Sequence, residues 1–266
     1  MKNIRELIIN ELSENLFDLE RWPHYRLMFS HLNEVINTIK KKDKVAILER
    51  CYIYNGFSIF SSLLNKYSKL DIYDFIPLNS QGKERQNYQL DKLESLPLTK
   101  KYIQKSKVSV TLESLKDLKT LGNKYDYFFI PNVLHHHPNP FKLIEDCRSL
   151  LNEKGYLYIF DATLREDHQK PDDFFRFTRS GIIYALENSQ FEVVEIHSSK
   201  SPVEALIYTI DQVIQYDLPK ELINEINGLS EIIKNKYKST IEKNYTNKYR
   251  KFTSFPVAYS VLARCK

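Results

Sequence analysis

The strongest constraint on the fold is a series of alternating apolar and amphipathic segments in the second half of the chain. The apolar run Tyr127–Ile130 ends in a polar, histidine-rich loop, a helical pattern follows over Pro140–Asn152, and a second apolar run covers Tyr156–Phe160. A further helix is predicted over Ser180–Asn188 and a further strand over Phe191–Ile196. Strands that alternate with helices in this way predict a parallel sheet, with ligands bound at the carboxyl ends of the strands.

The first half of the chain supplies the remaining strands of such a sheet. Val45–Leu48 is the candidate first strand, and a helix is predicted over Phe57–Lys66. Leu70–Ile76 and Lys107–Thr111 are the candidate second and third strands, joined by a polar connection over Gln81–Ile103. The alternation of strands and helices therefore extends over most of the chain.

The chain is predicted to be one α/β unit with helical additions. Residues 1–42 form an N-terminal helical cap, interrupted before Pro23 because a residue that precedes proline avoids the helical region. Residues 43–200 form a Rossmann-like core, and residues 201–266 form a helical insertion and a closing edge strand, Pro256–Arg264. The expected architecture is a doubly wound, seven-stranded and mostly parallel sheet.

Composition narrows the class of protein. The 266 residues carry a net charge of +5, which is modest for this length and favours solvated helix faces over nucleic-acid binding. The longest apolar runs are far shorter than the ~20 residues that cross a bilayer, and the N-terminal segment lacks the apolar core of a signal peptide. Three widely spaced cysteines indicate neither a disulfide framework nor a zinc ribbon. We therefore expect a cytoplasmic protein that binds neither membrane nor nucleic acid.

An acidic residue closes the second predicted strand. Asp74 lies about 20 residues beyond the loop after the first strand, which is the spacing of an acid that binds ribose hydroxyls in nucleotide-binding folds. The alternative is a solvated carboxylate in the turn before Pro77. The position and the residue type together favour ribose binding.

Three consecutive histidines, His135, His136 and His137, follow the fourth predicted strand. Successive side chains of an extended chain point to opposite sides, so the three rings are not expected to converge on one ion, and no metal is predicted. His135 or His136 is a candidate general base, because an unperturbed imidazole titrates near neutral pH. A histidine that only positions the loop is the alternative.

The fifth predicted strand ends at Asp161, which is a third candidate base at the same edge. Farther along, the segment DDFFRFT contains Arg176, which can pair with a substrate phosphate or carboxylate or, alternatively, with a nearby aspartate. Thr178 is a good helix N-cap. In the N-terminal cap, His24 is a candidate for substrate contact if that segment folds over the acceptor site, and a packing role is its alternative.

The segment VLHHHPNP over residues 133–140 and the later DDFFRFT segment resemble the second half of class I S-adenosylmethionine (SAM) dependent methyltransferases of the type 11-like kind. The resemblance covers roughly residues 43–198 and the final strand. It extends to methyltransferase-like proteins of bacterial capsule polysaccharide biosynthesis, including O-methyl phosphoramidate modification. It implies SAM as the cofactor and O-methylation of a small molecule or nucleotide-linked sugar.

The resemblance also assigns residues to the cofactor site. Cys51 and Ile53 stand where the family has glycines in its cofactor loop, so this loop either takes another path or does not hold SAM in the usual way. The expected cofactor-binding residues are Glu49, Cys51, Gly56, Asp74, Phe75, Glu113 and Asn132.

Two hypotheses of different classes follow. The first is an active SAM-dependent methyltransferase with His135, His136 or Asp161 as base and with His24, His137 and Arg176 at the substrate. The second is a non-catalytic methyltransferase-like protein that has lost SAM binding and acts as the partner of an active enzyme. A nucleotide-binding module on the same fold is a third alternative. A homo-oligomer is compatible with each of them.

Overall fold

The computed structural model describes a large part of the chain. The described residues are 4–15, 23–49, 53–54, 57–58, 64, 70–75, 96–97, 110–112, 122, 124–167, 173–199, 201–237, 239 and 255–266. The predicted connection over Gln81–Ile103 falls outside them, except at Leu96 and Pro97.

A seven-stranded sheet forms the centre of the molecule, as predicted. The strands lie in the order β5-β4-β1-β6-β7-β9-β8. All the neighbouring pairs are parallel, except that β9 runs antiparallel to both β7 and β8. The bounds are β1 Val45–Glu49, β4 Leu70–Phe75, β5 Val110–Leu112, β6 Tyr125–Pro131, β7 Leu151–Ala162, β8 Phe191–Ser198 and β9 Ala258–Cys265.

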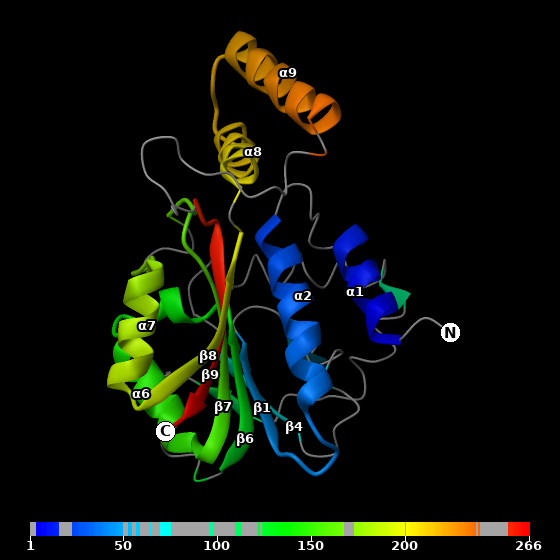
Figure 1. The fold of residues 1–266 in the computed structure, drawn as a ribbon. Helices are drawn as coiled ribbons and strands as arrows, with labels where there is room; N and C mark the ends of the chain where they lie inside the picture. Colours follow the sequence, from blue (N-terminus) through cyan, green and yellow to red (C-terminus); the bar gives the residue numbers. More distant parts are fainter. Residues whose placement is uncertain are drawn as a thin grey trace.

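Helices cover both faces of the sheet (Figure 1). On one face, α1 and α2 pack with the sheet in a core that contains Met28, Ile36 and Phe160; on the other face, α6 and α7 pack in a core that contains Ile144, Leu186 and Ile130. The insertion helices α8 and α9 lie beyond one end of the sheet. The bounds are α1 Ile4–Asn15, α2 Pro23–Thr38, α6 Pro140–Leu150, α7 Arg179–Asn188, α8 Pro202–Val213 and α9 Lys220–Lys236. No helix within these described ranges is long and apolar enough to cross a membrane.

The last strand differs from its predicted position. Pro256–Arg264 was expected at the edge of the sheet, but β9 inserts between β7 and β8, so that β8 becomes the edge. Seven of the eight residues of β9 are buried, with Arg264 as the exception, because both neighbours and both helical layers cover the strand. An apolar strand of this kind is favoured in the interior of a sheet.

Two predicted helix boundaries were also wrong. The helix expected over Pro140–Asn152 ends at Leu150, and Leu151 begins β7 by pairing with Tyr125 of β6. The helix expected from Phe57 does not begin there, because Phe57–Ser58 forms strand β3 and pairs with β2, Ile53–Tyr54. The rest of that predicted helix lies outside the described residues, apart from the helical Leu64.

Candidate active site

The carboxyl ends of the parallel strands bring the predicted site residues to one edge of the sheet. Glu49 is the last residue of β1, and its Cα atom pairs with that of Asp74 in β4. On the other side of β1, Pro131 of β6 pairs with Phe160 of β7, so Asn132 and Asp161 follow at the same level. The topology thus gathers four of the predicted residues at the edge where α/β folds bind ligands.

The predicted cofactor residues are described to different extents. Glu49 is fully buried. Phe75 closes β4 and pairs by register with Leu112 of β5. Cys51, Gly56 and Glu113 lie outside the described residues, so their assignment to the cofactor stays a prediction.

The segment after β1 contains a short antiparallel ribbon. Ile53 pairs with Ser58, and Tyr54 pairs with Phe57, with Asn55-Gly56 between them in the sequence. An Asn-Gly pair between two strands favours a β-hairpin, although a cofactor loop was expected at these positions. Ile53 therefore takes part in a strand, where a β-branched residue is favoured, instead of a turn that needs glycine.

Asn132 has a left-handed backbone conformation directly after β6, with a φ angle of 56°. Its N–H donates to the carbonyl oxygen of Phe160 over 2.7 Å, and its side-chain nitrogen donates to the hydroxyl of Tyr25 over 3.4 Å. Asparagine tolerates this conformation better than most residues, and such strained positions cluster at functional sites. Tyr25, which the sequence did not single out, thereby connects α2 to this edge.

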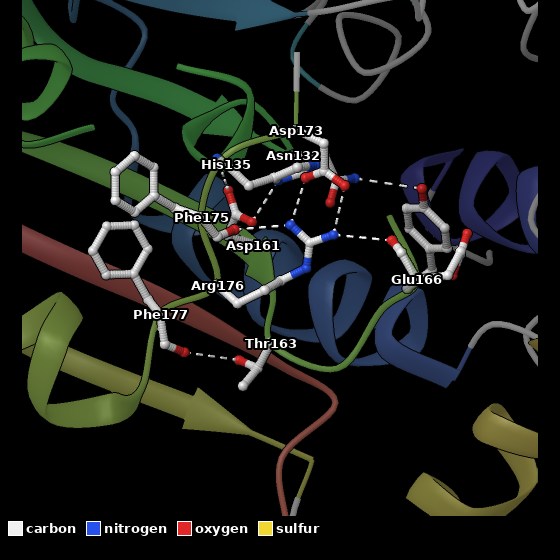
Figure 2. A network of polar contacts seen from close by, with 10 residues as sticks. Asn132, His135, Asp161, Thr163, Glu166, Asp173, Phe175, Arg176 and Phe177 are labelled. Carbon is white, nitrogen blue, oxygen red and sulfur yellow. Dashed lines mark hydrogen bonds and ion pairs between the residues drawn. The ribbon is translucent and has the colours of Figure 1, made fainter. Parts of the chain in front are cut away.

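His135 and Asp161 form a buried pair (Figure 2). His135 Nδ1 lies 2.6 Å from Asp161 Oδ1, and the backbone N–H of His135 donates to Asp161 Oδ2 over 3.1 Å. An ionised carboxylate only accepts hydrogen bonds, so it favours the proton on Nδ1 and leaves the lone pair on Nε2. A histidine that a carboxylate orients in this way has the arrangement of a general base.

The other two histidines are also buried, but they differ in their contacts. The His136 ring lies beside that of His135, with centroids 3.9 Å apart. His137 Nδ1 accepts a hydrogen bond of 2.9 Å from the backbone N–H of Asn139, whose own side chain caps α6 by accepting from the N–H of Lys142. This contact gives His137 a part in forming the loop.

The argument that the histidines diverge was wrong for His135 and His136. Residues Leu134–His136 form a 3₁₀ turn, not an extended chain, so neighbouring rings come together. Donor atoms of these two histidines and of Asp173 all lie within 4.8 Å of one another. Because Asp161 and Arg176 already engage two members of this group, we assign no ion to it.

Arg176 pairs with an aspartate of its own motif (Figure 2). Its two terminal nitrogens donate to the carboxylate oxygens of Asp173 over 2.5 and 2.7 Å, and one of them also donates to the carbonyl oxygen of Glu166 over 3.0 Å. Burial alone lowers the pKa of Arg176, but the hydrogen bonds and charge of Asp173 outweigh it and raise the pKa. The guanidinium therefore joins Asp173 to the backbone of Glu166.

His24 lies fully buried among aromatic rings of three elements. Its ring stacks on Phe160 of β7, with 6.1 Å between centroids, and lies edge-on to Tyr208 of α8 at 5.3 Å. Burial, followed by the charges of Arg165 and His135, holds the pKa of His24 well below its ordinary value. The ring is therefore neutral at neutral pH, and it joins the cap, the sheet and the insertion beside the site.

A small pocket borders Asp161 on the side of α7. Thr163, Phe177 and Tyr259 contribute to its lining, together with Ile182 of α7. The sequence did not single out Thr163 or Tyr259, and Tyr259 reaches the pocket through the pairing of β9 with Asp161 of β7.

No protein-family model matches the sequence, and no curated protein matches it. Among solved structures, the chain is similar to a SAM-dependent methyltransferase from Archaeoglobus fulgidus, with 15% identity, a TM-score of 0.47 and coverage of 90% of this chain and 93% of that one. It is also similar to the O-methyltransferase of a trans-AT PKS multienzyme of Brevibacillus brevis, in complex with S-adenosyl-L-homocysteine, with 16% identity, a TM-score of 0.44 and coverage of 95% and 78%. At these identities, the similarity concerns the fold and not the chemistry of the site.

Proposed function

We propose that this protein is a SAM-dependent methyltransferase that methylates a hydroxyl group of a small molecule. The His135–Asp161 pair carries the proposal, because it is a base with an orienting acid at the carboxyl edge of the sheet, where α/β folds bind ligands. The backbone register of Glu49 and Asp74 supports a nucleoside site at the same edge. A nucleotide-linked sugar or phosphoramidate of surface polysaccharide biosynthesis is the proposed class of acceptor.

SAM, when bound, supplies a methyl group on a positively charged sulfur, so the chain has to position the acceptor and remove its proton. His135 Nε2 would accept the proton of the acceptor hydroxyl, and bound SAM would supply the methyl group to the hydroxyl oxygen. Asp161 keeps Nδ1 protonated and offsets the positive charge that the ring acquires. Asp74 is the proposed acceptor of the ribose hydroxyls.

The β2–β3 ribbon favours a second function. At one position where the resemblance implies a glycine that lets the backbone approach the cofactor, this chain has Ile53, which is paired in a strand. The alternative is therefore a non-catalytic protein that retains the fold and binds an active methyltransferase.

Calorimetric titration of the full chain with SAM and with S-adenosylhomocysteine separates the two functions. Binding that saturates below about millimolar ligand, and that Asp74→Ala weakens, supports the methyltransferase. Glu192→Gln serves as the control variant, because this exposed carboxylate on β8 pairs only with Arg264 among the described contacts. Failure of both ligands to bind would favour the non-catalytic partner.

A further inference from the structure

A second cluster of histidines and a carboxylate lies on the face of the sheet that α2 covers, apart from the candidate active site. It consists of His31 of α2 and of Glu195 and His197 of β8. His31 Nε2 lies 3.2 Å from Glu195 Oε2, and His197 Nε2 lies 3.5 Å from the same oxygen. Donor atoms of all three residues lie within 4.8 Å of one another.

We propose that His31, Glu195 and His197 bind a divalent transition-metal ion, with zinc as the expected occupant, and that this ion fastens α2 to the edge strand of the sheet. The proposal is independent of methyl transfer, because none of the three residues belongs to the site described above.

The distances suit a single ion. Tetrahedral zinc with ligand bonds of ~2.0–2.1 Å places neighbouring ligand atoms roughly 3.3 Å apart. The contacts of 3.2 and 3.5 Å already have this length, and the two histidine nitrogens lie within 4.8 Å of each other. The side chains of Glu195 and His197 are 48% and 43% exposed, so they are free to adjust, and water can complete the coordination.

A chain of hydrogen bonds fixes the ring of His31. The Ser260 hydroxyl forms a hydrogen bond of 2.7 Å with His31 Nδ1 and one of 2.8 Å with the Tyr158 hydroxyl, which also donates to the carbonyl oxygen of Met28 over 3.4 Å. These bonds hold the ring with Nε2 toward Glu195. When Nε2 binds an ion, Nδ1 can donate to Ser260, and an outer hydrogen bond of this kind is typical of metal-binding histidines.

The ligand atoms combine a buried imidazole with a half-exposed carboxylate. His31 Nε2 faces Glu195 Oε2 at 3.2 Å, and the side chain of His31 is buried while that of Glu195 is 48% exposed. A metal ion between these side chains would bind both atoms, and imidazole ligands favour zinc and its neighbours over Mg²⁺ or Ca²⁺.

A β-bulge in β8 sets the direction of two of the ligands. The register with β9 shifts between Val193 and Glu195. Phe191 and Val193 pack in the core on the α7 side, and regular alternation would place Glu195 there as well. After the bulge, Glu195 pairs with Leu262, which belongs to the core on the α2 side. The bulge thus turns Glu195 and His197 toward α2, and bulges are known to re-aim side chains near functional sites.

The test is a titration of the full chain, freed of metal with a chelator, with Zn²⁺ by calorimetry and with Co²⁺ by its visible absorption. We expect one equivalent of Zn²⁺ to bind and to raise the melting temperature, while Mg²⁺ does neither. Glu195→Gln and His197→Ala should each weaken Zn²⁺ binding by more than about 100-fold, because even outer-shell changes cost 10–100-fold. Both side chains are half exposed, so these variants should fold, as circular dichroism will verify.

Two controls locate the ion. Glu192→Gln changes an exposed carboxylate on the same strand and should leave Zn²⁺ affinity unchanged. His136→Ala changes the other histidine cluster and should also leave it unchanged. The absence of saturable Zn²⁺ binding would overturn the proposal. Loss of binding in His136→Ala, with full binding in His197→Ala, would overturn it equally and assign the ion to the other cluster.

Discussion

At the scale of single residues, the His135–Asp161 pair makes the sharpest prediction. If His135 Nε2 takes the proton of the acceptor, His135→Ala should lower the turnover number by about 10²–10⁴-fold, the usual contribution of a general base. Asp161→Asn should act in the same direction, because it no longer holds the proton on Nδ1. The measurement is methyl transfer from labelled SAM, with calorimetry to verify that SAM affinity is kept. Full activity in His135→Ala would contradict the assignment.

His24 makes a prediction about pH. The folded-state pKa of His24 lies well below its ordinary value of 6.5. Above pH 6.5 the ring is neutral in both the folded and the unfolded chain, so it adds no pH dependence to the free energy of unfolding. Below pH 6.5, the imidazole of His24 takes up a proton in the unfolded chain but not in the folded chain. The free energy of unfolding therefore falls by up to about 1.4 kcal/mol per pH unit. When urea unfolding is measured between about pH 7.5 and 5.5, the free energy of unfolding should therefore fall more steeply for the natural chain than for His24→Phe. Equal losses would contradict the prediction.

At the scale of elements, the helix ends were predictable where a local signal sets them. Thr178 was expected to cap a helix, and its hydroxyl accepts from the N–H of Gly181 over 3.1 Å at the start of α7. Thr178→Ala should therefore lower the free energy of unfolding by about 1 kcal/mol, and Thr178→Ser, which keeps the acceptor, by much less. Denaturant titration of both variants measures this difference, and equal stability of the two would argue against the cap.

Other elements were mispredicted, because distant partners decide them. Leu151 continues an apolar helical pattern, but pairing with Tyr125 places it in β7. The hairpin of Ile53 with Ser58 carried a local Asn-Gly signal, which the expectation of a cofactor loop obscured. The bulge in β8 has no comparable local signal, since it depends on the register with β9. The cluster of His31 with Glu195 therefore joins residues 164 positions apart that no spacing argument connects.

At the scale of the whole molecule, the alternation of strands and helices predicted the sheet and its working edge. It did not predict that β9 returns between β7 and β8, although β9 contributes a residue beside each site. On one face, β9 brings Tyr259 to the pocket beside Asp161; on the other, it brings Ser260 to His31. Adjacent residues of one strand thus serve opposite faces, which is the alternation that any strand imposes.

This division between the two faces leads to a prediction for the intact protein. SAM at 100 times its dissociation constant should stabilise the fold by about 2.7 kcal/mol, and Zn²⁺ should stabilise it independently. Asp74→Ala should remove only the effect of SAM on the melting temperature, and His197→Ala only the effect of Zn²⁺. Ser260→Ala should weaken Zn²⁺ binding about 10-fold or more without changing SAM affinity, because it removes the hydrogen bond that orients the His31 ring. If either ligand lost its effect in the variant of the other site, the two faces would be coupled through β9, and the assignment of separate sites would be wrong.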